Sequence, residues 1–252
     1  MSARLGHIFR YPVKSAGGES LDRVALTPDQ PLPGDRRFAV LHGDALHHLE
    51  GEALRRWLPK AAFLRGAAAG SLQAITGGWR DGLLVLSHPD LPDLAFDPLH
   101  DQAAVLDWLA PLWADSGKAP AARLVEGVQA LTDVSEPWLS VLSLSSLRAL
   151  EEMVGQPLGT HRFRANLWIG GWEPFAEHDM QLHRIRIGDT VELALTRRIG
   201  RCAATSVDTA TGRFDVDLPA ALEKRFLHRD FGIYARVAVG GTIRQGDEVT
   251  LL

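Results

Sequence analysis

Short strand-like stretches separated by glycine- and proline-containing turns set the limits on what this chain can fold into. Residues 188–193 have the sequence Gly-Asp-Thr-Val-Glu-Leu and residues 246–251 have Gly-Asp-Glu-Val-Thr-Leu, so one turn-and-strand unit occurs twice. In each copy polar and apolar residues alternate after the turn, as in a half-buried strand. Such units are typical of β-barrels, although two short matches are too few for a true repeat. The sequence therefore predicts a mainly β fold with a few helices.

Further elements follow from local composition and spacing. Strands are predicted from β-branched and aromatic residues at 6–11, 21–26, 38–41, 71–75, 83–86, 139–142, 167–170 and 231–237. Helices are predicted at 99–113, between Ser143 or Ser145 and Gly155, near 218–227, and in part at 49–64. The connector at residues 117–120 suggests a division into a domain at 1–120 and a second at 121–252.

Composition excludes several classes of protein. The formal net charge is −4, whereas a general nucleic-acid binder is strongly basic. The sequence contains no run of 18 apolar residues that could span a membrane, and its first residues lack the apolar core of a signal peptide. One cysteine cannot form an internal disulfide. We therefore expect a soluble cytoplasmic protein that binds neither a nucleic-acid polymer nor a membrane.

The lone cysteine, Cys202, is the first candidate for chemistry. Arg197, Arg198 and Arg201 lie within five residues of it, and guanidinium charges favour the reactive thiolate over the thiol. The alternative is a buried cysteine that acts as a small hydrophobic side chain. The residues alone leave both interpretations open.

Three other stretches carry groups that bind anions. The turn at 13–18 presents Lys14 and Ser15 before two glycines, and Arg36 follows Asp35 at the start of a predicted strand. At 162–166, alternate residues of an extended chain share one face, so Arg162, Arg164 and Asn166 are predicted to form a row of hydrogen-bond donors. Each stretch also has a purely structural interpretation. The turn at 13–18 can be an ordinary solvated turn, Arg36 can pair with Asp35, and the row at 162–166 can be a solvated strand face.

Motifs for several common functions are absent. The sequence has no Gly-x-Gly-x-x-Gly fingerprint, no phosphate-binding loop ending in Gly-Lys-Ser/Thr, and no His-Glu-x-x-His. Zinc and iron–sulfur sites built from several cysteines are excluded by the single thiol.

Taken together, the ordered motifs resemble the MOSC family, the molybdenum-cofactor sulfurase C-terminal domain proteins. Tyr-Pro-Val-Lys-Ser at 11–15 and Gly-Asp-Arg-Arg-Phe at 34–38 resemble the opening of its N-terminal β-barrel domain. The motifs that resemble the MOSC domain occur in order at 133–135, 146–147, 162–166, 175–177, 187–189, 201–202, 231–232 and 246–247. The resemblance implies a MOSC-type β-barrel domain packed with an N-terminal β-barrel domain, with a ligand in the crevice between them.

The resemblance implies a molybdenum cofactor, a molybdopterin, with Cys202 as the protein thiolate on molybdenum. Its other implied contacts are Lys14, Ser15 and Arg36 in the first half, and Ser135, Arg164, Asn166 and Arg201 in the second. Cationic and hydroxyl groups of this kind suit a doubly charged phosphate. The family also carries an association with pyridoxal phosphate, for which no residue here argues. Departures from the family pattern, such as Ala165 in place of a proline and the Glu177-His178-Asp179 turn, affect the substrate side more than the cofactor.

The chain resembles the amidoxime-reducing proteins, which reduce small N-hydroxylated compounds. This resemblance implies an oxidoreductase whose electrons come from a separate donor protein, because no cysteine-rich ferredoxin segment follows in the sequence. Three alternatives remain: a sulfur carrier with a persulfide on Cys202, a protein that stores or transfers the cofactor without catalysis, and a barrel that has lost its ligand.

Overall fold

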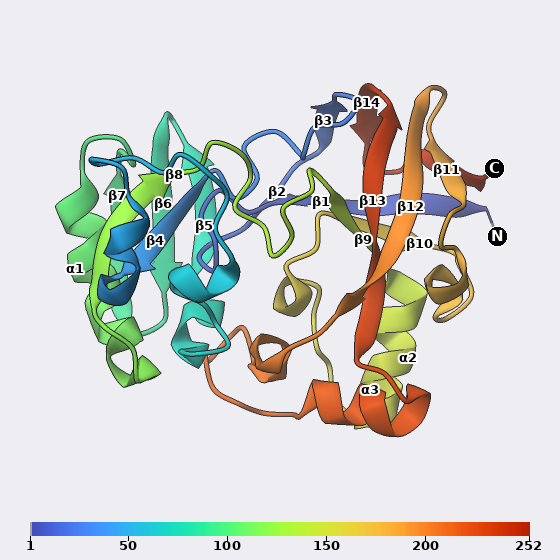
Figure 1. Ribbon diagram of the computed structural model, residues 1–252. Coiled ribbons are helices and arrows are strands. Elements are labelled where there is room, and N and C mark those ends of the chain that lie inside the picture. The colour runs from blue at the N-terminus through green and yellow to red at the C-terminus, as the bar shows by residue number, and fades with distance from the viewer. Residues whose placement is uncertain (1) are drawn as a thin grey trace.

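A closed seven-stranded β-barrel forms one half of the molecule. The computed structural model describes residues 2–252 (Figure 1). Around the barrel the strands run β1-β10-β9-β13-β12-β11-β15, and the pairing of β1 with β10 closes the ring. Their bounds are β1 (Ala3–Arg10), β9 (Leu139–Ser143), β10 (Leu167–Gly170), β11 (Arg184–Ile187), β12 (Val191–Gly200), β13 (Asp230–Val239) and β15 (Glu248–Leu251). The prediction of a mainly β fold is confirmed.

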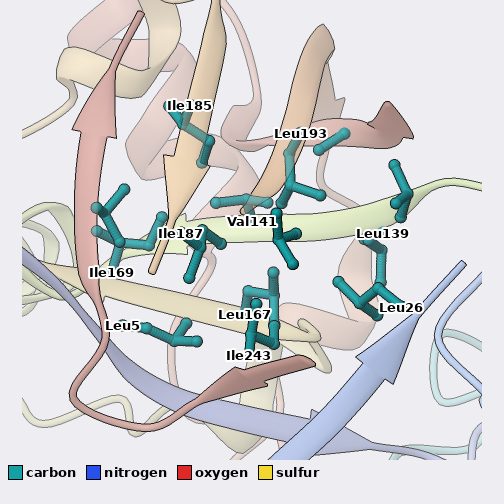
Figure 2. Packing of buried hydrophobic residues seen from close by; sticks show 14 of the residues in the cluster. Leu5, Leu26, Leu139, Val141, Leu167, Ile169, Ile185, Ile187, Leu193 and Ile243 are labelled. Carbon is teal, nitrogen blue, oxygen red and sulfur yellow. The ribbon is translucent and has the colours of Figure 1, made fainter. Parts of the chain in front are cut away.

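The repeated turn-and-strand unit contributes two of these strands. The first copy leads into β12 and the second into β15, and β11 pairs antiparallel with both of them. Alternate residues along β11 are buried, as the period of a strand requires. Leu5, Val141, Ile169, Ile187 and Leu193 meet inside the barrel, where water is excluded (Figure 2). The core thus draws on both ends of the chain.

The other half of the molecule contains smaller sheets around a helix. Its elements are β4 (Phe38–His42) paired with β8 (Ala121–Glu126), the meander β5 (Thr76–Arg80), β6 (Leu83–His88) and β7 (Leu91–Phe96), and α1 (Gln102–Trp113). As its spacing predicts, α1 buries Val105, Leu109 and Leu112 against the sheets. In Figure 1 this half lies on the left and the barrel on the right.

The strands at residues 3–10 and 19–26 belong with the barrel rather than with the small sheets. Besides β1, β2 (Glu19–Ser20) extends the barrel sheet, and β3 (Arg23–Leu26) pairs with β14 (Gly241–Arg244). The division at 120/121 stays a prediction, but the pairing shows that the chain starts in one half, visits the other and returns. The segment at residues 11–18 is therefore a crossing point between the two halves.

Helices α2 (Leu144–Val154) and α3 (Leu218–Phe226) cover one side of the barrel (Figure 1). Of the two serines predicted to cap α2, Ser143 does so, because its Oγ accepts a hydrogen bond from the Ser146 N–H at 3.2 Å. Gly155 ends the helix in the left-handed conformation, at φ 74°. None of the helices in residues 2–252 is long and apolar enough to cross a membrane.

Three local predictions were wrong. Residues 49–64 are mostly irregular, with a short 3-10 helix at Lys60–Ala62, although Leu54 and Leu58 are buried. Residues 71–75 lie in the 3-10 helix Gly70–Ala74 rather than in a strand. In both cases irregular segments bury apolar side chains. The sequence therefore has the hydrophobic pattern of a helix or strand, although the backbone is irregular or forms only a short 3-10 turn.

The third error concerns residues 162–166, which do not form an extended row. A 3-10 turn occupies His161–Phe163, and Arg164 follows in the left-handed region at φ 49°. The alternation expected of a strand is therefore broken, and the side chains of Arg162, Arg164 and Asn166 have different partners instead of sharing one face.

Candidate functional site

A cavity of about 400 Å³ lies between the two halves of the molecule. It is lined by segments around Lys14, Arg36 and Lys60 from the first half of the sequence, and by the segments 132–140 and 197–205 from the second half. Its size is that of a small-molecule or cofactor pocket. The crevice implied by the resemblance is therefore present.

The cavity is strongly basic although the chain is acidic overall. Nine of the lining residues are lysine or arginine, and Asp133 is the one acidic residue among them. The basic residues are Lys14, Arg36, Lys60, Arg65, Arg162, Arg164, Arg197, Arg198 and Arg201. Such a concentration of one sign in a cleft attracts anionic ligands.

Cys202 lies on the cavity wall just beyond the end of β12. Its carbonyl accepts hydrogen bonds from the Thr205 N–H at 3.0 Å and the Thr205 Oγ1 at 2.9 Å, which fix the turn that follows the strand. The residue is partly exposed and lines the cavity. It is therefore reachable by a ligand, unlike a cysteine that only fills a core.

Lys14 is held at the crossing point between the halves. Its Nζ donates to the Leu131 carbonyl at 2.9 Å and to the Asp133 carboxylate at 2.7 Å. Burial lowers the pKa of Lys14, and the Asp133 carboxylate opposes that effect. An ammonium group has three donors, so one remains for a ligand. Ser15, next along the same turn, also lines the cavity and has φ 64°.

Arg36 is fixed by a buried acid and an aromatic ring. Its Nη1 donates to Asp35 Oδ2 at 2.5 Å, its Nη2 donates to the Arg164 carbonyl, and its guanidinium lies 4.5 Å from the centroid of Tyr11. Burial disfavours the charge, but Asp35 outweighs this effect and raises the pKa of Arg36. The predicted Asp35–Arg36 pair therefore forms, and the guanidinium keeps further donors for a ligand.

Arg164 holds the turn that carries Lys14. Its guanidinium donates to the carbonyls of Gly17 at 2.8 Å, Val13 at 3.2 Å and Ala16 at 3.3 Å. Burial lowers the pKa of Arg164 to about 10, which still leaves it charged at neutral pH. This side chain therefore shapes the anion-binding turn as well as adding charge to the cavity.

Arg201 is fixed in a similar way next to Cys202. Its Nε donates to the Phe231 carbonyl at 2.8 Å and its Nη1 donates to the Phe163 carbonyl at 3.2 Å. Burial lowers the pKa of Arg201 to about 10. Most of its donors are used by the protein, so its main contribution to the cavity is positive charge beside the thiol.

The remaining predicted residues differ in their surroundings. Asn166 lines the cavity, but its Oδ1 accepts from the Ser140 N–H at 3.1 Å and the Ser140 Oγ at 3.0 Å. Ser135 is exposed and is not part of the lining. Arg162 is buried and forms a bidentate pair with Asp215, at 2.7 Å for each bond. The structure thus brings Lys14, Ser15, Arg36, Arg164, Asn166, Arg201 and Cys202 together, and leaves Ser135 outside.

Several residues that line the cavity were not predicted from the sequence as part of a site. Lys60 donates to Asp133 Oδ2 at 3.2 Å, so this partly exposed carboxylate lies between two lysines. Their charges outweigh its partial loss of hydration and hold the pKa of Asp133 well below its usual range. Trp138 lies 5.8 Å from Tyr234 between ring centroids, and Arg197 lies 5.1 Å from the Trp138 ring. An isolated lysine or arginine in an irregular loop has no pattern that marks it as part of a site.

Comparison with known proteins agrees with this architecture. The MOSC domain family matches residues 131–250, and the MOSC N-terminal beta barrel domain family matches residues 2–123. The chain therefore belongs to the MOSC-domain proteins that carry this N-terminal domain, as the motifs predicted.

Individual relatives are more distant. The chain is 31% identical over 123 residues to mitochondrial amidoxime-reducing component 1 of Xenopus laevis, a match that covers 44% of this chain and 35% of that protein. Among solved structures, YiiM from Geobacillus stearothermophilus is 20% identical, with a TM-score of 0.36 over 45% of this chain and 53% of that one. The YUAD protein from Bacillus subtilis is 11% identical, with a TM-score of 0.47 over 100% of this chain and 96% of that one.

The residues present fit a molybdenum cofactor. Its phosphate needs cationic and hydroxyl donors, which Lys14, Ser15 and Arg36 supply on one wall. A molybdenum centre accepts a soft thiolate, and Cys202 is the only cysteine of the chain. Residues 2–252 contain no group of three or more His, Cys, Asp or Glu side chains placed to hold a metal ion by themselves.

Proposed function

We propose that this protein binds a molybdenum cofactor in the basic cavity and reduces small N-hydroxylated compounds with electrons from a separate donor protein. The observation that carries the proposal is the position of Cys202, the single thiol, on the wall of a cavity with nine cationic side chains. The domain families and the amidoxime-reducing relative support the same class of chemistry.

Each group of residues has a defined task in this proposal. Lys14, Ser15 and Arg36 hold the phosphate of the cofactor, and Arg164 keeps their turn in place through its carbonyl contacts. Arg201, which is fixed by the Phe231 carbonyl, adds positive charge to the cavity next to Cys202. The bound cofactor supplies oxygen-atom and two-electron chemistry, and the protein supplies orientation and electrostatics. The overall reaction takes two electrons and two protons, and it releases the amine-type product and water.

Elemental analysis after production in a host that makes molybdenum cofactor tests the proposal. We expect near-stoichiometric molybdenum and pterin in the wild type, and loss of molybdenum with an unchanged fold in Cys202→Ser. Reduction of benzamidoxime by the loaded protein with a chemical electron donor tests the reaction itself.

Two alternatives are separated by the same samples. Absence of molybdenum together with a cyanide-releasable sulfur on Cys202 would replace the proposal with a sulfur carrier. Bound cofactor without turnover of any N-hydroxylated compound would favour a storage or transfer protein.

A further inference from the structure

Arg65 differs from the other cations of the cavity. The other eight lysine and arginine side chains each have a hydrogen bond or ion pair with a protein group, for example Arg198 Nε with the His178 carbonyl at 2.9 Å and Arg197 with Glu136 at 3.7 Å. Within residues 2–252, no such side-chain partner is found for Arg65, which is partly buried. A guanidinium at a cavity wall without a protein partner has its planar set of donors free for a ligand.

The backbone fixes the position of Arg65. Its carbonyl accepts from the Ala68 N–H at 3.0 Å and the Ala69 N–H at 3.2 Å, which closes a turn directly after the residue. The next residue, Gly66, packs so closely on Gln73 that a Cβ there would lie 2.8 Å from Gln73 Cγ. Arg65 is therefore anchored by its neighbours rather than by its own side chain.

The same glutamine joins this wall to the wall that carries the thiol. Gln73 is buried and its Nε2 donates to the Ala204 carbonyl at 2.9 Å, two residues after Cys202. Arg65 thus lines the cavity from a loop that Gln73 joins to the Cys202 turn, on a different segment from Lys14 and Arg36. If Lys14 and Arg36 bind the phosphate of the cofactor, as proposed above, the charge of Arg65 has no counterion.

We propose that Arg65 is a specificity-determining residue that binds a carboxylate or phosphate group on the substrate. This inference rests on the proposed function, and it narrows the substrate class to anionic N-hydroxylated compounds. A planar guanidinium forms two parallel hydrogen bonds to a carboxylate or phosphate oxygen pair, which a neutral substrate cannot accept with the same strength.

The test uses cofactor-loaded wild-type protein, Arg65→Gln, Arg65→Lys and the matched control Arg80→Gln, which removes an exposed arginine outside the cavity. The reduction of benzamidoxime is compared with that of 4-carboxybenzamidoxime. Binding of the unreactive probes benzamide and 4-carboxybenzamide is measured by calorimetry, and molybdenum and pterin content is determined for every sample.

In the wild type we expect the carboxylated compound of each pair to be preferred, with about a tenfold advantage in kcat/KM and in affinity. Arg65→Gln should remove that advantage by lowering kcat/KM for 4-carboxybenzamidoxime about tenfold more than kcat/KM for benzamidoxime, while the cofactor content stays at the wild-type level. Arg65→Lys should keep part of the advantage, and Arg80→Gln should keep all of it.

Equal loss for both compounds, or loss of the cofactor from Arg65→Gln, would overturn the proposal and place Arg65 in cofactor binding. Failure of the proposed function gives a different result. A protein that prefers 4-carboxybenzamide through Arg65 yet reduces neither amidoxime would support the subsite and overturn the reaction.

Discussion

The guanidinium of Arg164 donates a 2.8 Å hydrogen bond to the carbonyl of Gly17, which lies 147 residues earlier in the chain. This contact joins the barrel half to the turn that carries Lys14 and Ser15. The walls of the cavity are therefore set relative to each other by buried polar contacts, and several of these contacts are open to direct tests.

Arg164→Lys should destabilise the protein and weaken cofactor retention. A lysine ammonium cannot reproduce the fork that serves the carbonyls of Val13, Ala16 and Gly17, so buried acceptors would lose their partners. We expect a loss of about 2 kcal/mol in unfolding free energy, measured by urea denaturation. Arg37→Lys, at an exposed pair with Glu126, is the control and should change stability by less than about 0.5 kcal/mol. Equal effects of the two substitutions would contradict the assigned role.

Asp215→Ala should be among the most destabilising single changes in the barrel half. The Arg162 side chain is 1% exposed, and both of its ion-pair bonds go to Asp215 at 2.7 Å. Removing the acid leaves a buried charge without its counterion, at a cost of about 3 kcal/mol. Urea denaturation of the wild type, Asp215→Ala and the double variant Arg162→Met/Asp215→Ala measures the change in the free energy of unfolding. The double variant should recover part of the loss, and a larger loss in the double than in the single variant would refute the argument.

Asp133→Asn should increase the affinity of the cofactor-free protein for inorganic phosphate. Among residues 2–252, Asp133 is the only acidic residue that lines the cavity, and its charge partly neutralises Lys14 and Lys60. Removing one negative charge at such distances is worth about 1 kcal/mol, or roughly fivefold in dissociation constant. Titration calorimetry at low salt checks this, with the exposed Asp107→Asn as control. Weaker phosphate binding in Asp133→Asn would show that the carboxylate serves the site mainly by holding the lysines in position.

Stability should depend on His178 in mildly acidic solution. Burial lowers the pKa of His178 from 6.5 to about 4, and the charges of Arg198 and His228 act in the same direction. Because the unfolded state binds the proton more tightly, the stability from the neutral ring is complete above pH 6.5 and is lost as the pH falls toward 4. The loss is about 1–3 kcal/mol. Unfolding curves of the wild type and His178→Gln from pH 7 to 4 should converge as the pH falls, and parallel curves would exclude this role.

Local sequence patterns determined many of the elements. The spacing of Val105, Leu109 and Leu112 identified α1. Gly155 marked the end of α2, and two serines, Ser143 and Ser145, were the candidates for its start. These predictions succeed because capping and amphipathic burial depend on residues within a few positions of each other. The paired turn-and-strand units likewise pointed to a barrel, and the ordered motifs pointed to the MOSC family.

The tertiary structure decided which of the anion-binding residues share one cavity. Local pattern placed Arg162 and Arg164 on one strand face, but packing made one a buried partner of Asp215 and the other a clamp on the Lys14 turn. Arg65 lies in a loop that Gln73 joins to the Cys202 turn, 131 residues later than Gln73 in the chain. Contacts between segments more than a hundred residues apart leave no periodic trace in the sequence. The sequence therefore determined the chemical groups and most of the strands, and long-range packing determined their arrangement around one cavity.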